Sequence, residues 1–459
     1  MNRAGVQCLA LFVAGAVLAA ASGLAAAEAP RRDPEVVFKR LDANGDGRLS
    51  PAEFDALPAS RRVPGLFGRL DRNGDGVVVP AEFNALLGLR GEAGEPRPQA
   101  AAAALAPPVV AKGTAVEIAR YRAASEYSAR FAGLHLLVMK DGEVVFEQHA
   151  QGASPRQAYQ IASGTKSFWG PLAQVAVGEG LFTLDEVVAG TLSEWKADSR
   201  KARITVRDLL TFSSGLEAPR RLWAEKDKDL YKLVLELPAV ADPGTIFAYS
   251  EVHLYAFGEF LKRKLAQRAR ANGTAPERPW DYLNRTILTP IGLTGLRWSV
   301  DGSGAPRMGA GAVLTARQWA TYGELLRQGG AWQGQQLIPR EGVAACFASS
   351  RANAAYGLTF WLNRASDKAG VAQADIAGGG RTRSSDQVSA RGIVPGRLPD
   401  LVMAAGAGQQ RLFISAAEKL VVVRFANADM PRLVMAGDYS KLNLNFKDEE
   451  FFARLLAPN

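Results

Sequence analysis

Ser163 and Lys166 lie three residues apart in the segment Ser163-Gly164-Thr165-Lys166. On a helix, side chains at this spacing share one face, so the lysine amine can lie beside the serine hydroxyl. A lysine that is partly desolvated loses its proton more readily and can then act as a base toward the serine. A serine at the start of a helix also has free backbone N–H groups nearby that can stabilise an oxyanion. The pair therefore predicts a serine nucleophile that needs no histidine.

The same spacing recurs at Ser193 and Lys196, so the neighbouring residues decide between the two pairs. Ser163 precedes an apolar run suited to a buried helix, whereas Ser193 lies among charged residues. The chain has only 3 histidines, and it contains no G-x-S-x-G, Walker or H-E-x-x-H motif. Ser163 is therefore the predicted nucleophile.

Two near-duplicate segments beginning at Asp42 and Asp71 carry oxygen-bearing residues at regular spacing. Both fit the D-x-[DN]-x-[DN]-G-x5-E pattern of an EF-hand loop, in which a glycine makes the sharp turn. A single match would also fit an ordinary Asp/Asn/Gly-rich turn, but two in tandem favour calcium binding. The predicted ligands, with backbone carbonyls at Arg48 and Val77, are Asp42, Asn44, Asp46, Arg48 and Glu53 in the first loop and Asp71, Asn73, Asp75, Val77 and Glu82 in the second.

The two loops are predicted to pair through Leu49 and Val78, which occupy the position where EF-hand loops contact each other. Val79 offers no side-chain oxygen, so the second loop is expected to be the weaker site. We expect weak, structural calcium sites with Kd values on the order of 10⁻⁴ to 10⁻³ M.

Composition and the positions of Pro- and Gly-rich stretches divide the chain into four parts. Residues 1–27 combine a short positive start, an apolar run and a cleavage site at Ala27, which predicts a signal peptide and a periplasmic or secreted protein with no integral membrane span after processing. A single membrane anchor is the alternative. Residues 28–90 form the calcium-binding pair, 91–113 a Pro/Ala/Gly-rich linker and 114–459 a large domain.

The net charge of +9 is modest for 459 residues. It could attract an anionic cell-envelope polymer, or it could reflect scattered solubilising arginines. Without aromatic interleaving or a recognised motif, it gives no case for nucleic-acid binding.

The large domain begins and ends with strand patterns and is mostly helical between them. An Asp141-Gly142 turn joins two apolar segments, and a second strand pair is expected at 411–415 and 419–426. Helical patterns cover 206–210, 254–265 and 316–326. This arrangement predicts an α+β fold, with an antiparallel sheet flanked by helices, preceded by a small all-α pair.

Several ordered segments of 114–459 resemble the penicillin-recognising serine hydrolases, especially the class C β-lactamase and esterase branch. The segments that carry the resemblance are Ile161–Phe168, Gly180–Asp185, Ile204–Leu216, Pro243–Glu251, Gly311–Leu326 and Tyr356–Trp361. The resemblance implies that Ser163 is acylated, that Lys166 activates it, and that Tyr249 passes the proton to the leaving group and later activates water. A literal Y-x-N at Tyr282 and Asn284 lies in a helical run and is interpreted as coincidence. The resemblance implies no organic cofactor.

Two positions depart from the family pattern. Glu251 stands where the family usually has asparagine, and a carboxylate there would favour protonated Lys166 unless it points elsewhere. The third motif aligns with Ala404-Ala405-Gly406, which lacks the usual cation and hydroxyl. Ala407 could still supply the second backbone N–H of an oxyanion hole. The arginines that could replace the missing cation are Arg381, Arg383 and Arg411.

These departures favour an esterase or amidase over a β-lactamase or cell-wall peptidase. The sequence therefore predicts an exported serine hydrolase acting on a small ester, amide or peptide, with relatives of 6-aminohexanoate-dimer hydrolase as one comparison. The alternative is a catalytically degenerate binding protein that retains the fold, which Glu251 and Ala404 favour. The composition of the linker predicts flexibility, so we expect calcium to affect stability or attachment more than rate.

Overall fold

The computed structural model describes residues 38, 41–55, 67–70, 76–80, 83, 104–219, 222, 225, 227–366, 391–427 and 445–457. Contacts divide the chain into two units, 1–98 and 99–459, and each is described by itself. The expectations that fall outside the described residues are the signal peptide at 1–27, most of the linker, the second-loop ligands Asp71, Asn73, Asp75 and Glu82, and the arginines Arg381 and Arg383.

The small unit contains the predicted pairing of the two loops. Leu49 and Val78 form an antiparallel bridge in which each N–H donates to the other's carbonyl, at 2.8 and 2.9 Å. Phe38 and Phe83 pack edge to face, with ring centroids 5.5 Å apart. Its described helical segments are α3 (Pro51–Asp55) and α4 (Phe67–Leu70). The contact expected from the loop spacing is therefore present.

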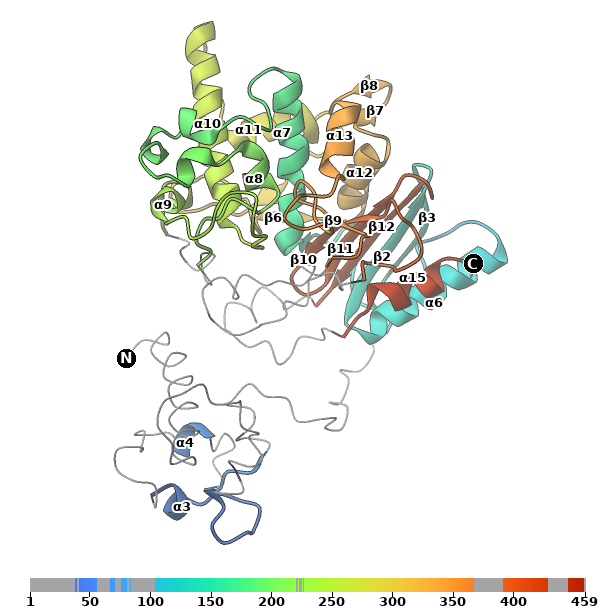
Figure 1. Ribbon diagram of the computed structural model, residues 1–459. Coiled ribbons are helices and arrows are strands. Elements are labelled where there is room, and N and C mark those ends of the chain that lie inside the picture. Colours follow the sequence, from blue (N-terminus) through green and yellow to red (C-terminus); the bar gives the residue numbers. More distant parts are fainter. Residues whose placement is uncertain are drawn as a thin grey trace. The chain divides into compact units, whose positions relative to one another are not determined.

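A seven-stranded sheet forms one side of the large unit (Figure 1). The strand order is β1-β3-β2-β12-β11-β10-β9, and every neighbouring pair is antiparallel. The two predicted strand pairs lie side by side at its centre, as β2–β3 and β11–β12. The strands of the sheet are β1 (Val110–Ala111), β2 (Gly133–Lys140), β3 (Glu143–His149), β9 (Trp361–Leu362), β10 (Val402–Gly406), β11 (Gln410–Ser415) and β12 (Leu420–Ala426).

The C-terminal part of the predicted linker belongs to this sheet. β1 pairs with β3, and Val109 N–H and Lys112 N–H donate to the carbonyls of Glu147 and Val145 at 2.8 and 2.7 Å. The prediction that 91–113 is all linker is therefore wrong for 104–113. The edge strand β1 begins at the β-branched Val110, and the Pro/Ala/Gly-rich composition of the segment does not indicate it.

Helices cover both faces of the sheet. Figure 1 shows α6 (Ala115–Arg130) and α15 (Asp448–Leu455) together on one side, and α12 (Ala316–Arg327) on the other. Thr114 and Thr315 each cap a helix through a capping box, which fixes where α6 and α12 begin. This is the α+β arrangement that the sequence predicts.

A helical region joins the two ends of the sheet. Short strands β4 (Tyr159–Gln160), β6 (Ala312–Leu314) and β5 (Arg297–Trp298) form a second sheet, and β7 (Ala331–Trp332) pairs with β8 (Gln335–Gln336). The remaining helical elements are η2 (Ala162–Phe168), α7 (Trp169–Gly178), η3 (Val188–Gly190), η4 (Ser193–Trp195), η5 (Lys201–Arg203), α8 (Val206–Leu210), α9 (Leu230–Glu236), α10 (Val252–Asn272), α11 (Pro279–Leu283), the π-helix η7 (Asn284–Leu288) and α13 (Arg340–Cys346).

Across the described part of the chain, no helix is both long and apolar enough to cross a membrane.

Candidate active site

Ser163 and Lys166 both lie on η2, a 3₁₀ helix at the edge of the helical region. Side chains three residues apart eclipse each other on a 3₁₀ helix, so the pair is closer than an α-helix would make it. Lys166 Nζ donates to Ser163 Oγ at 2.9 Å. Ser163 is half-buried, whereas Lys166 is only 3% exposed. A substrate can therefore reach the hydroxyl while the amine stays largely out of water.

The second Ser-x-x-Lys pair differs in its burial, although Ser193 also begins a 3₁₀ helix, η4. Ser193 and Lys196 are both exposed on the surface. The neighbouring residues in the sequence therefore distinguish Ser163 and Lys166, whose lysine is buried, from the exposed pair.

A backbone carbonyl holds the buried amine in place. Lys166 Nζ donates to Gly309 O at 2.8 Å and lies 5.2 Å from the centre of the Tyr249 ring. Tyr249, predicted as the proton shuttle, therefore lies beside the serine–lysine pair. Gly309 was not predicted, because a carbonyl contact across 143 residues leaves no signature in the residue types.

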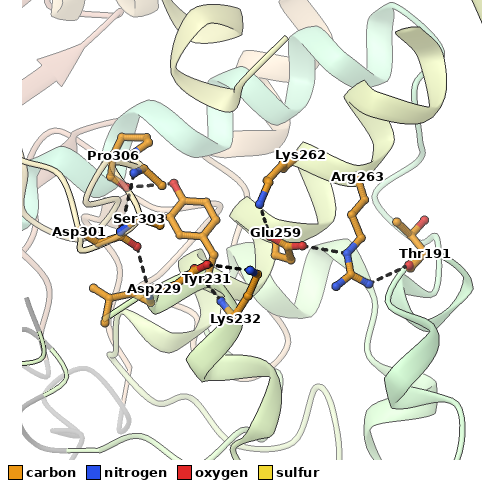
Figure 2. Close-up of polar contacts among 12 residues, drawn as sticks. Thr191, Asp229, Tyr231, Lys232, Glu259, Lys262, Arg263, Asp301, Ser303 and Pro306 are labelled. Atoms are coloured by element: carbon orange, nitrogen blue, oxygen red, sulfur yellow. Dashed lines mark hydrogen bonds and ion pairs between the residues drawn. The ribbon is translucent and has the colours of Figure 1, made fainter. Parts of the chain in front are cut away.

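The segment leading to Gly309 is tied to α9. The Asp301 carboxylate accepts from Leu230 N–H, and the Tyr231 hydroxyl donates to Pro306 O, both at 2.9 Å (Figure 2). These bonds place the chain that carries the lysine's acceptor against a helix of the buried core. The position of Gly309 is thus set by the fold rather than by local turn chemistry.

The Tyr249 ring is enclosed by other aromatic rings. Trp361 stacks against it at 5.4 Å, and Phe212 and Tyr356 pack edge to face at 5.6 and 6.0 Å. Aromatic pairs with these separations contribute to stability beyond the area that they bury. These three ring contacts therefore hold the Tyr249 side chain in a fixed position.

Glu251 lies close to Gly309, whose carbonyl accepts the hydrogen bond from Lys166. Its carboxylate accepts from the Tyr255 hydroxyl at 3.4 Å, and a Cβ at Gly309 would come within 2.4 Å of its Cδ. The carboxyl group thus packs on the residue whose carbonyl holds Lys166, and only a glycine at 309 leaves room for it. Burial raises the pKa of Tyr255 well above its usual value, so this phenol stays protonated and can donate to Glu251.

The end of β10 lies against the start of η2. A Cβ at Gly406 would come within 2.0 Å of Ile161 O, so the strand and the helix meet backbone to backbone. Ala407 follows in the β10–β11 turn and is partly exposed. Ala162, directly before Ser163, has φ of +47°, a left-handed conformation that costs energy in an alanine. This contact brings the predicted third motif next to the predicted nucleophile.

Arg411 does not replace the missing cation of the third motif. It is 2% exposed, and its Nε donates to Asp448 at 3.2 Å, beneath α15. A buried guanidinium that is paired in this way has no free charge for a substrate carboxylate. That possibility is therefore wrong for Arg411.

One further interpretation, that of the literal Y-x-N, agrees with the structure. Tyr282 is buried, and its hydroxyl donates to Glu179 at 2.9 Å, so the Y-x-N at 282–284 is structural. Cys346, the free cysteine of the described residues, is buried in the core, and burial raises its thiol pKa well above the usual range. Neither residue contributes to the site.

The first predicted calcium loop is closed by hydrogen bonds from its own backbone. The Asp42 carboxylate accepts from the N–H groups of Gly45 and Gly47 at 2.8 and 2.9 Å. Glu53 reaches back to Ala43 N–H at 2.9 Å. Over the described residues, no three His, Cys, Asp or Glu side chains converge as a metal-ligand group. The donor types and the positive φ of Gly47 (+78°) nevertheless fit a loop that wraps around a hard cation.

Comparison with known proteins gives a family match within each unit. A family model described as Beta-lactamase matches residues 112–443, and one described as EF hand matches 35–58. No curated protein matches the sequence significantly.

Solved structures share the fold of the large unit. A family VIII carboxylesterase is 17% identical with a TM-score of 0.52, over 77% of this chain and 100% of that one. A penicillin-binding protein homolog from Caulobacter crescentus is 17% identical with a TM-score of 0.51, over 70% and 93%. SurE with D-Leu is also 17% identical with a TM-score of 0.51, over 75% and 78%. At this identity the likeness shows the fold alone.

Proposed function

The chain belongs to the beta-lactamase family of serine hydrolases, and on that premise we propose that it cleaves an ester or an amide through an acyl-enzyme formed on Ser163. The observation that carries the proposal is the 2.9 Å contact between the buried Lys166 amine and the half-buried Ser163 hydroxyl. As the unprotonated amine, Lys166 takes the hydroxyl proton while Ser163 Oγ bonds to the substrate carbonyl carbon.

Two other groups complete the proposed reaction. Tyr249, whose ring lies 5.2 Å from Lys166 Nζ, passes the proton to the leaving group and later activates the water that releases the acyl group. The backbone N–H groups of Ser163 and Ala407 stabilise the oxyanion, a task that needs no side chain.

The surroundings of the third motif support esters and amides over β-lactams. Ala404 and Ala405 carry no charge or hydroxyl, and Arg411 is already paired with Asp448. A β-lactam or cell-wall peptide presents a carboxylate that would have no cation among these residues. A neutral acyl group needs no such partner.

We expect a fluorophosphonate probe to modify the full-length protein at Ser163. Ser163→Ala should abolish the adduct, and Ser193→Ala, in the matched surface Ser-x-x-Lys, should leave it unchanged. Mass spectrometry of the digested protein locates the modified residue. Folded wild-type protein that forms no adduct would refute the proposal and leave a binding protein with a degenerate site.

We also propose that the first loop binds calcium as a structural ion. Asp42, Asn44, Asp46 and Glu53 supply side-chain oxygens, and Arg48 supplies its backbone carbonyl. Hydrogen bonds from the backbone and hydroxyl of Ser50 lower the pKa of Glu53, which keeps it in the ionised form that a cation requires. The apolar segment 8–20 supports export, to a compartment where calcium at these affinities would fill the loop.

Replacing the predicted calcium ligand at the end of the loop should weaken this binding. We expect Glu53→Gln to weaken calcium binding about 10-fold or more, because it removes a bidentate carboxylate. Glu126→Gln, at an exposed glutamate on α6, should leave it unchanged. Isothermal titration calorimetry of the whole chain checks this, and equal calcium affinity in both variants would contradict it.

A further inference from the structure

His253 is a fully buried histidine in the first turn of α10, four residues after Tyr249. One ring nitrogen, Nδ1, lies 2.8 Å from Ser214 Oγ, and the other, Nε2, lies 2.8 Å from Ala248 O. Ser214 is also fully buried. Both nitrogens of the imidazole therefore have a partner, one on each side of the ring.

The partners determine which nitrogen carries the proton. A carbonyl oxygen only accepts, so Nε2–H donates to Ala248 O. In the neutral ring Nδ1 then accepts from the Ser214 hydroxyl, whose oxygen in turn accepts from Leu216 N–H at 3.3 Å. Burial lowers the pKa of His253 to about 4, so the neutral form is present at neutral pH.

This bond fixes the backbone that carries Tyr249. Ala248, the residue before it, is held at both polar groups, since its N–H donates to Phe212 O at 2.8 Å and its carbonyl accepts from His253. The Phe212 ring stacks on the imidazole at 5.2 Å and also contacts the Tyr249 ring. His253 thus acts on the tyrosine through the backbone and through a shared aromatic neighbour.

The buried Ser214–His253 pair cannot be a second nucleophilic centre, because neither side chain is reached by solvent. We propose that His253 is a positioning residue that holds the Tyr249 phenol where it can protonate the leaving group. The inference deepens the proposed serine hydrolase function and rests on it. A displaced phenol should impair proton delivery while leaving the Ser163–Lys166 pair intact.

Two esters with the same acyl group separate these effects. p-Nitrophenolate leaves without a proton, whereas ethoxide needs one, so only ethyl butyrate depends on the general acid. In His253→Leu we expect kcat/KM for ethyl butyrate to fall about 30-fold or more, and kcat/KM for p-nitrophenyl butyrate to stay within about 3-fold of wild type. Tyr249→Phe should show the same selectivity.

Conservative and remote variants test the assignment. The amide of His253→Gln can donate to Ala248 and accept from Ser214, so it should recover most of the ethyl butyrate activity. His135→Leu changes another buried histidine, which pairs with Glu147 on the sheet, and should not discriminate between the esters. If His253→Leu does not fold, the double variant Ser214→Ala/His253→Phe replaces it in the experiment. This double variant removes the buried hydroxyl together with the imidazole, so no hydroxyl is left without a partner.

Phosphonylation of Ser163 separates failure of the inference from failure of the proposed function. Fluoride leaves without a proton, so folded His253 variants should be phosphonylated within about 3-fold of the wild-type rate. Equal losses for both esters, or no loss for either, in a variant that is still phosphonylated would overturn the role of His253. A wild-type protein that is not phosphonylated would instead overturn the hydrolase itself.

Discussion

Lys166→Met is expected to slow phosphonylation of Ser163 by about 10³- to 10⁴-fold, because it removes the base that takes the hydroxyl proton. The amine lies 2.9 Å from Ser163 Oγ and is held there by Gly309 O. Lys166→Arg should fail equally, since a guanidinium keeps its charge at neutral pH and cannot accept the proton. The second-order rate constant of fluorophosphonate labelling is the measurement.

Lys201 provides a matched control for this experiment. It is another buried lysine that donates to a backbone carbonyl, Leu235 O at 3.1 Å, and lies over an aromatic ring, that of Trp195. Lys201→Met loses a comparable bond, so it should destabilise the fold comparably while labelling at the wild-type rate. If the Lys166 and Lys201 variants label equally fast, Lys166 is not the base.

Local spacing was sufficient to predict the parts of the site that lie within one segment. Ser163 and Lys166 are three residues apart, and any helical conformation brings them together. The hairpin at Asp141-Gly142 and the bridge between Leu49 and Val78 follow from equally local patterns, and all three are present.

Contacts between distant segments could not be predicted in this way. The Gly309 carbonyl reaches Lys166 only because Asp301 and Tyr231 tie its segment to α9. The sequence offers Arg411 as a cation for the site, but the register of β11 places its side chain beneath α15, where it pairs with Asp448. Residue types specify what chemistry a side chain offers, but the sheet register decides which face it points to.

His253, two residues beyond the segment Pro243–Glu251, illustrates the same limit. Its neighbours Tyr249 and Glu251 were predicted as site residues, whereas a lone histidine at the start of an apolar helix gives no sign of its role. The role depends on Ser214, which is 39 residues away in the chain. The hydrogen bonds of His253 with Ser214 and with Ala248 become apparent only in the folded structure, because the residue types do not indicate that these segments meet.

Gly406→Ala is expected to disrupt the site although it adds a single methyl group. That Cβ would come within 2.0 Å of Ile161 O and 3.2 Å of Gln410 Cβ, so the strand and the start of η2 must move apart. We expect a loss of about 1–3 kcal/mol in the free energy of unfolding, as for overpacked cores. Because Ile161 is two residues before Ser163, the displacement should also slow phosphonylation about 10²-fold, the effect of misplacing a reacting group by about 1 Å.

Gly190→Ala separates this effect from the general cost of replacing a glycine. Gly190 is exposed, its φ is not positive, and a Cβ there would meet no atom within 4 Å. This variant should stay within about 0.5 kcal/mol of wild type and label at the same rate. Urea denaturation and labelling kinetics on the two variants provide the comparison. If Gly406→Ala matches Gly190→Ala in both, the end of β10 does not constrain the nucleophile, and the oxyanion role of Ala407 loses its structural basis.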